Sequence, residues 1–327
     1  MNNPFISFVI PTYNEEKDIE SCINHVLDNP YSNKEIIVVD SASSDNTPEI
    51  LERFAKKKLI YFIQEDTRNG VSSARNLGAS KTRGDILVIL NADVLLEPDY
   101  CDRIIKHYQK EADFVLCDSV VVNTDQVFGA FVQSLHDRDY EGKTDLVWTE
   151  GFSCRRRVFE SVGGFKRFPR ESAGEDAALG FDLDKKYKRV FDSSIKARHI
   201  VTTDSKEFAK LRIERGKGAF FFDVLYNIQN PTHIIIKRLR KYIFFFLTTL
   251  LLIIFNFYLF LIIFTLLFLI WFKQSINKSL IMSKKYKFFW PFLYLNLKES
   301  YWSLKGYLLG ANYYFRNRRL FIENKSK

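Results

Sequence analysis

The residues best suited to chemistry in this chain are polar side chains that follow short apolar runs. Asn91 and Asp93 follow the predicted strand from Asp85 to Leu90, which is apolar after its first residue. Their side chains should share one side, because side chains alternate along a strand. A carboxylate in that place can hold Mg²⁺ or Mn²⁺, which prefer oxygen ligands and often bridge phosphates. An aspartate that closes a strand can also cap a helix or form a turn, so this pair alone leaves both interpretations open.

Two other apolar runs end in polar loops of the same kind. The run from Phe5 to Ile10 is followed by the segment from Pro11 to Glu15, which offers backbone groups, an aromatic face and a carboxylate. A second run ends on Asp40, whose carboxylate can accept hydrogen bonds from a base or a ribose. Together, the three loops supply the groups that a nucleotide diphosphate needs.

The segments between these loops alternate between strand and helix patterns. We expect helices over residues 14–27, 44–54 and 71–80, from the spacing of their apolar residues, and a further strand over residues 59–63. This alternation predicts a mainly parallel sheet covered by helices, which binds ligands beyond the carboxyl ends of its strands. The three polar loops should therefore converge on one site.

Taken in order, these segments resemble the inverting family-2 glycosyltransferases, which have the GT-A fold. The resemblance covers about residues 5 to 200. The matching segments are Phe8 to Glu15, Val38 to Asp45, Gly70 to Asn76, Asn91 to Asp93, Gly163 to Phe165 preceded by Arg156, and Gly174 to Asp176. The resemblance implies an α/β fold, a Rossmann-like GT-A domain with a mainly parallel sheet, which the apolar C-terminal region would follow with transmembrane or interfacial helices.

The resemblance also implies roles for individual residues. Asp176 would be the general base that takes a proton from the acceptor hydroxyl in a direct, inverting displacement. Asp93 would ligate the Mg²⁺ or Mn²⁺ that neutralises the departing nucleotide diphosphate, and His199 stands where many relatives supply another metal ligand. The residues implied to bind the nucleotide sugar are Pro11, Thr12, Tyr13, Glu15, Asp40, Arg75, Asn91 and Asp93. A strand-end histidine and an acidic helix start also have ordinary structural explanations.

The chain departs from the family pattern at several points. Asn91 replaces the first aspartate of the usual Asp-x-Asp, which leaves one carboxylate for the metal. Ser41 and Ala42 replace the usual Asp-Gly of the second motif, which weakens any inference about the base. The Gln-x-x-Arg-Trp motif of processive members is absent, so we expect one sugar per encounter. Candidate contacts for the acceptor or the diphosphate are Glu175, Arg215 and Lys217, although the last two also suit a solvated or lipid-facing surface.

Composition and charge restrict the class of partner. The chain has 327 residues, a net charge of +9 and four widely spaced cysteines without a Cys-x-x-Cys pair. We therefore expect reduced, buried thiols rather than a zinc site or a disulfide framework. A basic chain can bind nucleic acid or an anionic membrane. Here many of the cations flank an apolar run, which favours lipid headgroups over nucleic acid.

That apolar run lies between Lys241 and Lys273 and contains no charged residue. A single helix of this length would measure about 45 Å, against about 30 Å of hydrocarbon. A tilted span and a hairpin turning near Asn256 both fit, and we favour the hairpin because it keeps both basic flanks on one side of the membrane. Met1 to Pro4 leads directly into an apolar strand instead of a signal peptide. We therefore expect a membrane location with the catalytic domain on the cytosolic face.

These inferences predict four segments along the chain. The segments are a GT-A domain at 1–225 (nucleotide-sugar half 1–118, acceptor half 119–225), a basic juxtamembrane linker at 226–241, a membrane segment at 242–272, and a basic, aromatic interfacial tail at 273–327.

The predicted function is inverting transfer of a sugar from a nucleotide-sugar donor to a hydroxyl acceptor. Attachment to a membrane makes a lipid-linked acceptor or glycan a natural partner, because a domain at the bilayer meets such acceptors in two dimensions. Two alternatives remain. One is a polyprenyl-phosphate sugar synthase, whose nucleophile is a phosphate, and the other is a non-catalytic membrane scaffold with a decayed donor site.

Overall fold

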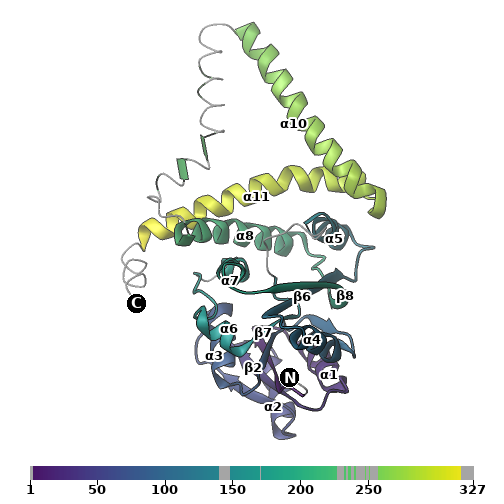
Figure 1. Ribbon diagram of the computed structural model, residues 1–327. Coiled ribbons are helices and arrows are strands. Elements are labelled where there is room, and N and C mark those ends of the chain that lie inside the picture. Colours follow the sequence, from purple (N-terminus) through teal and green to yellow (C-terminus); the bar gives the residue numbers. More distant parts are fainter. Residues whose placement is uncertain are drawn as a thin grey trace. The chain divides into compact units, whose positions relative to one another are not determined.

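The computed structural model describes residues 3–139, 148–169, 171–226 and 257–317, together with isolated positions between 232 and 250 (Figure 1). Contacts divide the chain into two compact units. The first unit comprises residues 1–124 and 135–202, and the second comprises residues 125–134 and 203–327. The segment boundaries predicted from the sequence stay a prediction.

The first unit is built on a mixed sheet that, within the described residues, has eight strands in the order β3-β2-β1-β4-β7-β6-β8-β5. The strands are β1 (Ile6–Thr12), β2 (Lys34–Asp40), β3 (Tyr61–Gln64), β4 (Ile86–Ile89), β5 (Val94–Leu96), β6 (Phe114–Val121), β7 (Phe152–Arg155) and β8 (Arg189–His199). Strands β3, β2, β1 and β4 pair in parallel, as do β6 and β8. The antiparallel pairs involve β7 or β5. The predicted GT-A fold class is confirmed, with a sheet more mixed than the alternation of the first hundred residues indicates.

Helices cover both faces of this sheet. They are α1 (Ile19–Asp28), α2 (Thr47–Lys56), α3 (Val71–Lys81), α4 (Tyr100–Gln109), α6 (Arg156–Ser161) and α7 (Glu175–Asp184), while α5 (Val127–Asp139) crosses the boundary between the units. Because side chains alternate along β1, Phe8 and Ile10 join the apolar cluster with α1, α2 and α4. Val9 joins the cluster on the other face, with α6 and α7. The central strands are thus buried on both faces, as their unbroken apolar runs predict.

The first helix begins later than the apolar spacing predicts. The sequence indicated a helix from Asn14, but α1 begins at Ile19. Asn14 has a φ of 57°, outside the right-handed helical region. Its N–H donates to Ser43 Oγ at 2.8 Å, and its Oδ1 accepts from the N–H of Ser44 at 2.8 Å. These bonds join the loop after β1 to the loop after β2, and they draw residues 14–18 away from the helix.

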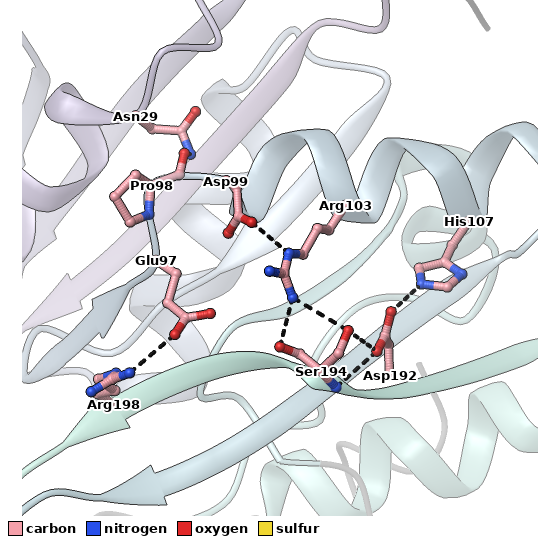
Figure 2. A network of polar contacts seen from close by, with 9 residues as sticks. All are labelled: Asn29, Glu97, Pro98, Asp99, Arg103, His107, Asp192, Ser194 and Arg198. Carbon is pink, nitrogen blue, oxygen red and sulfur yellow. Dashed lines mark hydrogen bonds and ion pairs between the residues drawn. The ribbon is translucent and has the colours of Figure 1, made fainter.

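A network of polar contacts fastens α4 to β8 (Figure 2). Arg103 donates to the carbonyl oxygen of Ser194 at 2.7 Å, and His107 Nε2 lies 2.7 Å from Asp192 Oδ2. The N–H and the hydroxyl of Ser194 both donate to Asp192 Oδ1. Burial alone would raise the pKa of Asp192, but the bonds from Ser194 and His107 lower it to about 2. The network fixes the strand whose last residue is His199.

The second unit contains α8 (Ser205–Tyr226), α10 (Phe257–Tyr286) and α11 (Phe289–Arg316), and α8 runs alongside α11 (Figure 1). Gly216 and Gly306 allow this close approach, because a Cβ at either would collide with the facing backbone. Arg212 joins the same interface by donating to both carboxylate oxygens of Glu299, each at 2.6 Å.

One helix of the described residues meets the length and hydropathy of a membrane span. This segment, Leu261–Tyr286 within α10, has 26 residues and a mean hydropathy of 1.4. The turn predicted near Asn256, the linker 226–241 and the first part of the 242–272 segment lie outside the residues that are described continuously. The hairpin therefore stays a prediction. The expectation of buried thiols is confirmed: all four cysteines are buried, and burial raises the pKa of Cys101 to about 12.

We expect Asp192→Asn to lower the free energy of unfolding by about 1–2 kcal/mol at pH 6, because it replaces the carboxylate that accepts these charge-assisted hydrogen bonds with a neutral amide. The carboxyl pKa is lower in the folded state, so its contribution is present above pH ~4 and is lost as the pH falls towards about 2. Urea unfolding of both proteins between pH 6 and pH 3, followed by circular dichroism, measures this difference.

Glu52→Gln is the control, because its ion pair with Lys56 is exposed and should contribute less than about 0.5 kcal/mol. A loss for Asp192→Asn that stays constant down to pH 3, or that equals the control, would contradict the proposed role of the network.

Candidate active site

The three polar loops meet at one pocket, as predicted. The pocket has a volume of about 340 Å³ and lies at the carboxyl ends of the parallel strands β1, β2 and β4. It is lined by Pro11, Thr12, Tyr13, Glu15, Ser41, Arg68, Gly70, Val71, Arg75, Asn91, Ala92 and Asp93. All the predicted nucleotide-sugar residues belong to this lining except Asp40. The volume suits a small ligand.

Asp40 lies beneath the pocket wall and holds its own loop together. It is fully buried, and its Oδ1 accepts from Thr12 Oγ1 at 3.1 Å and from Ser43 Oγ at 2.5 Å. Its Oδ2 accepts from the N–H of Ser43 at 3.0 Å. Ser41, which follows Asp40, stands on the pocket wall instead. Contact of Asp40 with a base or ribose stays a prediction, and its visible role is to shape the loop.

An aromatic–cation pair forms one side of the pocket. The guanidinium of Arg68 lies over the ring of Tyr13, 3.8 Å from the ring centroid. A planar base can stack on either group, because both present a flat face. Sequence reasoning missed Arg68, because an isolated arginine in a polar loop carries no motif and only the fold brings it to Tyr13.

The start of α3 forms another side of the pocket. Gly70 has a φ of 91°, a conformation that favours glycine, and Val71 opens the helix. Gly70 is the N-cap residue and makes no side-chain hydrogen bond to the helix start, so the first N–H groups of α3 are not capped by it. A helix N-terminus carries a partial positive charge and suits a phosphate. The start of α3 therefore suits the phosphates of a ligand in this pocket.

Arg75 is buried at the base of the site and joins three parts of the fold. It donates to Glu175 Oε1 at 2.7 Å, to Asn91 Oδ1 at 2.8 Å and to Thr149 Oγ1 at 2.9 Å. Only 4% of the Arg75 side chain and 8% of the Glu175 side chain are exposed. Among the described residues, Arg75 Nε and Glu175 Oε2 have no hydrogen-bond partner. The amide oxygen of Asn91 is thus held by Arg75, and contact of Arg75 with the diphosphate stays a prediction.

His199 is brought to Asp93 by the pairing of β8 with β5, in which His199 lies opposite Val94. Burial raises the pKa of Asp93 and Glu150 adds to the rise, while His199 opposes it. Ser119 Oγ lies 3.2 Å from His199 Nε2, and the ring of His136 stacks on His199 with centroids 5.9 Å apart. These neighbours hold the imidazole in place, and the role of His199 as a metal ligand stays a prediction.

Asp93 and His199 supply only part of the ligand set that a divalent metal needs. Asp93 offers carboxylate oxygen and His199 offers imidazole nitrogen, both donor types for Mn²⁺. No group of three or more His, Cys, Asp or Glu side chains with the geometry of a metal site occurs in the portion of the chain that is described. A bound metal would therefore need further ligands from the substrate or from water.

Asp176 lies in the first turn of α7, directly after Glu175. Burial raises the pKa of Asp176, Glu175 raises it further, and Arg75 opposes the rise, which leaves the pKa at about 7. A carboxyl group with that pKa is suited to general base catalysis near neutral pH. Glu150 follows Thr149, whose hydroxyl accepts a hydrogen bond from Arg75, and its charge contributes to the raised pKa of both Asp93 and Asp176. Sequence reasoning missed Glu150, which forms part of a short polar segment before β7.

Arg215 and Lys217, the other candidates for acceptor contact, lie on α8 in the second unit. Arg215 is exposed and Lys217 is half-buried. Neither belongs to the pocket lining, and their role stays a prediction. Glu175 is buried against Arg75, and its contact with an acceptor also stays a prediction.

Comparison with known families agrees with the fold and the pocket. The sequence model described as Glycosyl transferase family 2 matches residues 7–162, and the one described as Glycosyl transferase family group 2 matches residues 86–273. The second match covers more than half of the 327 residues. The chain therefore belongs to the family 2 group of glycosyl transferases.

Curated relatives include the putative glycosyltransferase EpsH of Bacillus subtilis, 30% identical over 36% of this chain and 34% of its own length. Glycosyltransferase GlyG of Streptococcus pneumoniae is 30% identical over 41% of this chain and 45% of its own length. The chain thus covers less than half of these relatives.

Two solved structures share the fold. The mannosyltransferase PcManGT from Pyrobaculum calidifontis, in complex with GDP-Man and Mn²⁺, has a TM-score of 0.54 and 22% identity, over 69% of this chain and 65% of its own. Residues 1–349 of S. aureus TarS have a TM-score of 0.51 and 17% identity, over 70% of this chain and 67% of that chain. At these identities the likeness shows the fold.

We expect Arg75→Met to lower the free energy of unfolding by about 3 kcal/mol, because it leaves Glu175 as a buried charge without its partner. Adding Glu175→Gln should recover part of the loss, since the unpaired charge is then removed. Urea unfolding at constant detergent concentration, followed by circular dichroism, provides the measurement.

The matched control is Arg53→Met, whose ion pair with Glu20 is exposed and should contribute less than about 1 kcal/mol. If Arg75→Met cost no more than this control, Arg75 would not hold the site together.

Proposed function

We propose that this chain transfers a sugar from a nucleotide-sugar donor to a hydroxyl acceptor at the cytosolic face of a membrane, with inversion at the anomeric carbon. The observation that carries the proposal is the Arg75–Glu175 ion pair, because it joins a pocket suited to a nucleotide diphosphate to the helix start that holds Asp176, a carboxyl group whose pKa is about 7. Asp176 itself is not part of the pocket lining. Membership in the family 2 group of glycosyl transferases supports the reaction class.

In this proposal the donor occupies the pocket with its base beside Tyr13 and Arg68 and its diphosphate between the start of α3 and Asp93. The complex of the Pyrobaculum mannosyltransferase with GDP-Man and Mn²⁺ supports a donor bound together with a metal. Asp93 and His199 would hold Mg²⁺ or Mn²⁺, with diphosphate oxygens as further ligands. The metal, when bound, neutralises charge on the departing nucleoside diphosphate.

Asp176 would act as the general base in the transfer step. Its carboxylate accepts the proton of the acceptor hydroxyl as that oxygen forms a bond to the anomeric carbon. The bond from the anomeric carbon to the diphosphate breaks at the same time, and the nucleoside diphosphate leaves with the bonding electron pair. Attack from the face opposite the leaving group inverts the anomeric centre. Arg75 contributes by holding Glu175, and with it the start of α7, against Asn91.

The membrane part of the proposal rests on the second unit. The candidate span in α10 and the basic residues at its C-terminal end, Lys284, Lys285 and Lys287, support attachment with these cations on the cytosolic side. An enzyme held at the bilayer meets lipid-linked acceptors in two dimensions, which favours a lipid-linked hydroxyl acceptor or glycan over a soluble one.

We expect Asp176→Asn to reduce turnover by about 10²–10⁴-fold while donor binding is retained, because an amide cannot accept the hydroxyl proton. The pH dependence has a definite sign. Wild-type turnover should rise as Asp176 loses its proton through about pH 7, and this acidic limb should be absent in the variant. Turnover is followed as release of nucleoside diphosphate, donor binding by thermal shift, and inversion by NMR of the product anomeric proton.

The matched control is Asp182→Asn on the same helix, whose carboxylate pairs with Lys166 and Lys185 and should leave turnover nearly unchanged. Near-normal turnover of Asp176→Asn would instead favour a phosphate acceptor, as in a polyprenyl-phosphate sugar synthase. If no nucleotide sugar were turned over by the wild type, the transferase proposal would fail in favour of a scaffold.

A further inference from the structure

One face of α11 carries aromatic and lysine side chains that point away from the rest of its unit. They recur at steps of three or four residues, so they form a single stripe along the helix. The aromatic–lysine face consists of Trp290, Tyr294, Lys298, Tyr301, Lys305 and Leu308. Its three aromatic side chains are 74%, 57% and 55% exposed, in chain order. Large rings are seldom left in water to this extent without a partner.

The opposite face of α11 packs against other helices of the second unit. Phe292 and Tyr307 are buried there, and Gly306 lies against the backbone of α8. Tyr307 also donates to Asp223 Oδ2 of α8 at 2.8 Å. The helix therefore separates two kinds of surface: one packs against α8, and the other presents rings and ammonium groups outwards.

The charge on the outward face has one sign. Residues 257–316 contain eight basic residues and a single acid, Glu299. Both oxygens of Glu299 accept hydrogen bonds from Arg212, on the packed side. On the outward face the Lys298 ammonium lies 5.6 Å from the ring centroid of Tyr294, and both Lys298 and Lys305 approach Tyr301. The face is thus apolar and cationic, so an occupant must be apolar and anionic.

This face is continuous in sequence with the candidate span. Only Lys287 and Phe288 separate α10 from α11. The end of α10 is fixed to the start of α11, because Asn296 Nδ2 donates to Ser279 Oγ at 3.0 Å and both residues are buried. If α10 crosses a bilayer, α11 begins at the level where that bilayer ends. Tryptophan and tyrosine are the residues that favour this boundary.

We propose that the aromatic–lysine face of α11 lies in the headgroup layer of an anionic membrane, with its rings at the acyl boundary and Lys298 and Lys305 on lipid phosphates. Such helices bind through buried apolar area together with attraction between basic side chains and anionic lipids. A second copy of the chain fits the face less well, since a two-fold contact would set lysine against lysine. The inference rests on the membrane attachment proposed above, and it is independent of sugar transfer.

Spin-label accessibility in nanodiscs tests the position of this face. Tyr294, Tyr301 and Leu308 are each replaced by cysteine in a separate variant of the full chain that keeps the native cysteines. Each variant is labelled with a nitroxide at the new cysteine. The four native thiols are buried, so the labelled wild type serves as the blank. Tyr61→Cys is the control, because Tyr61 is 58% exposed on the edge strand β3 of the first unit. The discs contain phosphatidylcholine with phosphatidylglycerol, or phosphatidylcholine alone.

In the anionic discs we expect labels at Tyr294, Tyr301 and Leu308 to collide several-fold less with a water-soluble nickel chelate than the label at Tyr61. They should also collide more with dissolved oxygen, which concentrates in lipid. The shielding should weaken in neutral discs and in the Lys298→Gln/Lys305→Gln background. Unchanged melting temperatures would show that these variants are folded.

Nickel accessibility equal to that of Tyr61 would overturn the proposal. Shielding that is the same in neutral discs would overturn the assignment of the lysines to lipid phosphates. Shielding accompanied by spin–spin broadening that disappears on dilution with unlabelled protein would assign the face to a second copy. None of these measurements depends on turnover, so their failure and the failure of the proposed transferase reaction are distinguishable.

Discussion

A buried ion pair between Arg75 and Glu175, 2.7 Å apart, links the two parts of the candidate site. The same guanidinium holds Asn91, which lies in the loop after β4, while Glu175 begins α7. Asp93 and Asp176 each lie within two residues of these anchors, so one arginine sets the frame for both carboxyl groups. Burying such a pair is costly unless its geometry is good. In the proposed mechanism, this pair holds the donor pocket and Asp176 in a fixed relation.

The mixed sheet provides the rest of that frame. Its parallel strands β1, β2 and β4 bring three loops to one edge, which forms the pocket. The antiparallel pairing of β5 with β8 adds His199 to the same edge, beside Asp93. The polar network around Asp192 holds β8 in place from the side of α4. Within the described residues, the second unit contains no part of this sheet. Its helix α11 packs against both α8 and α10 and leaves the aromatic–lysine face exposed.

The sequence predicted the pocket because three polar loops follow apolar strands, and parallel strands bring such loops to one edge of the sheet. The sequence predicted Asp93 and Tyr13 at this site. It did not show that the Asp40 carboxylate accepts hydrogen bonds from Thr12 and Ser43 and is thereby held away from the pocket lining. Arg68 and Glu150 were missed, because their neighbours in space are distant in the chain. The late start of α1 follows from cross-loop bonds of Asn14, which no local apolar pattern records.

In the proposed function, Asp93 binds a nucleotide-sugar donor through a divalent metal. The most direct test of this binding is the melting temperature of the full chain with UDP-, GDP- and dTDP-sugars, with and without Mn²⁺. We expect one nucleotide to stabilise the wild type in the presence of Mn²⁺, by about 2.7 kcal/mol at a donor concentration of ~100 times Kd. Asp93→Asn should lose that gain. An equal gain in Asp93→Asn, or one that does not need the metal, would contradict the claim.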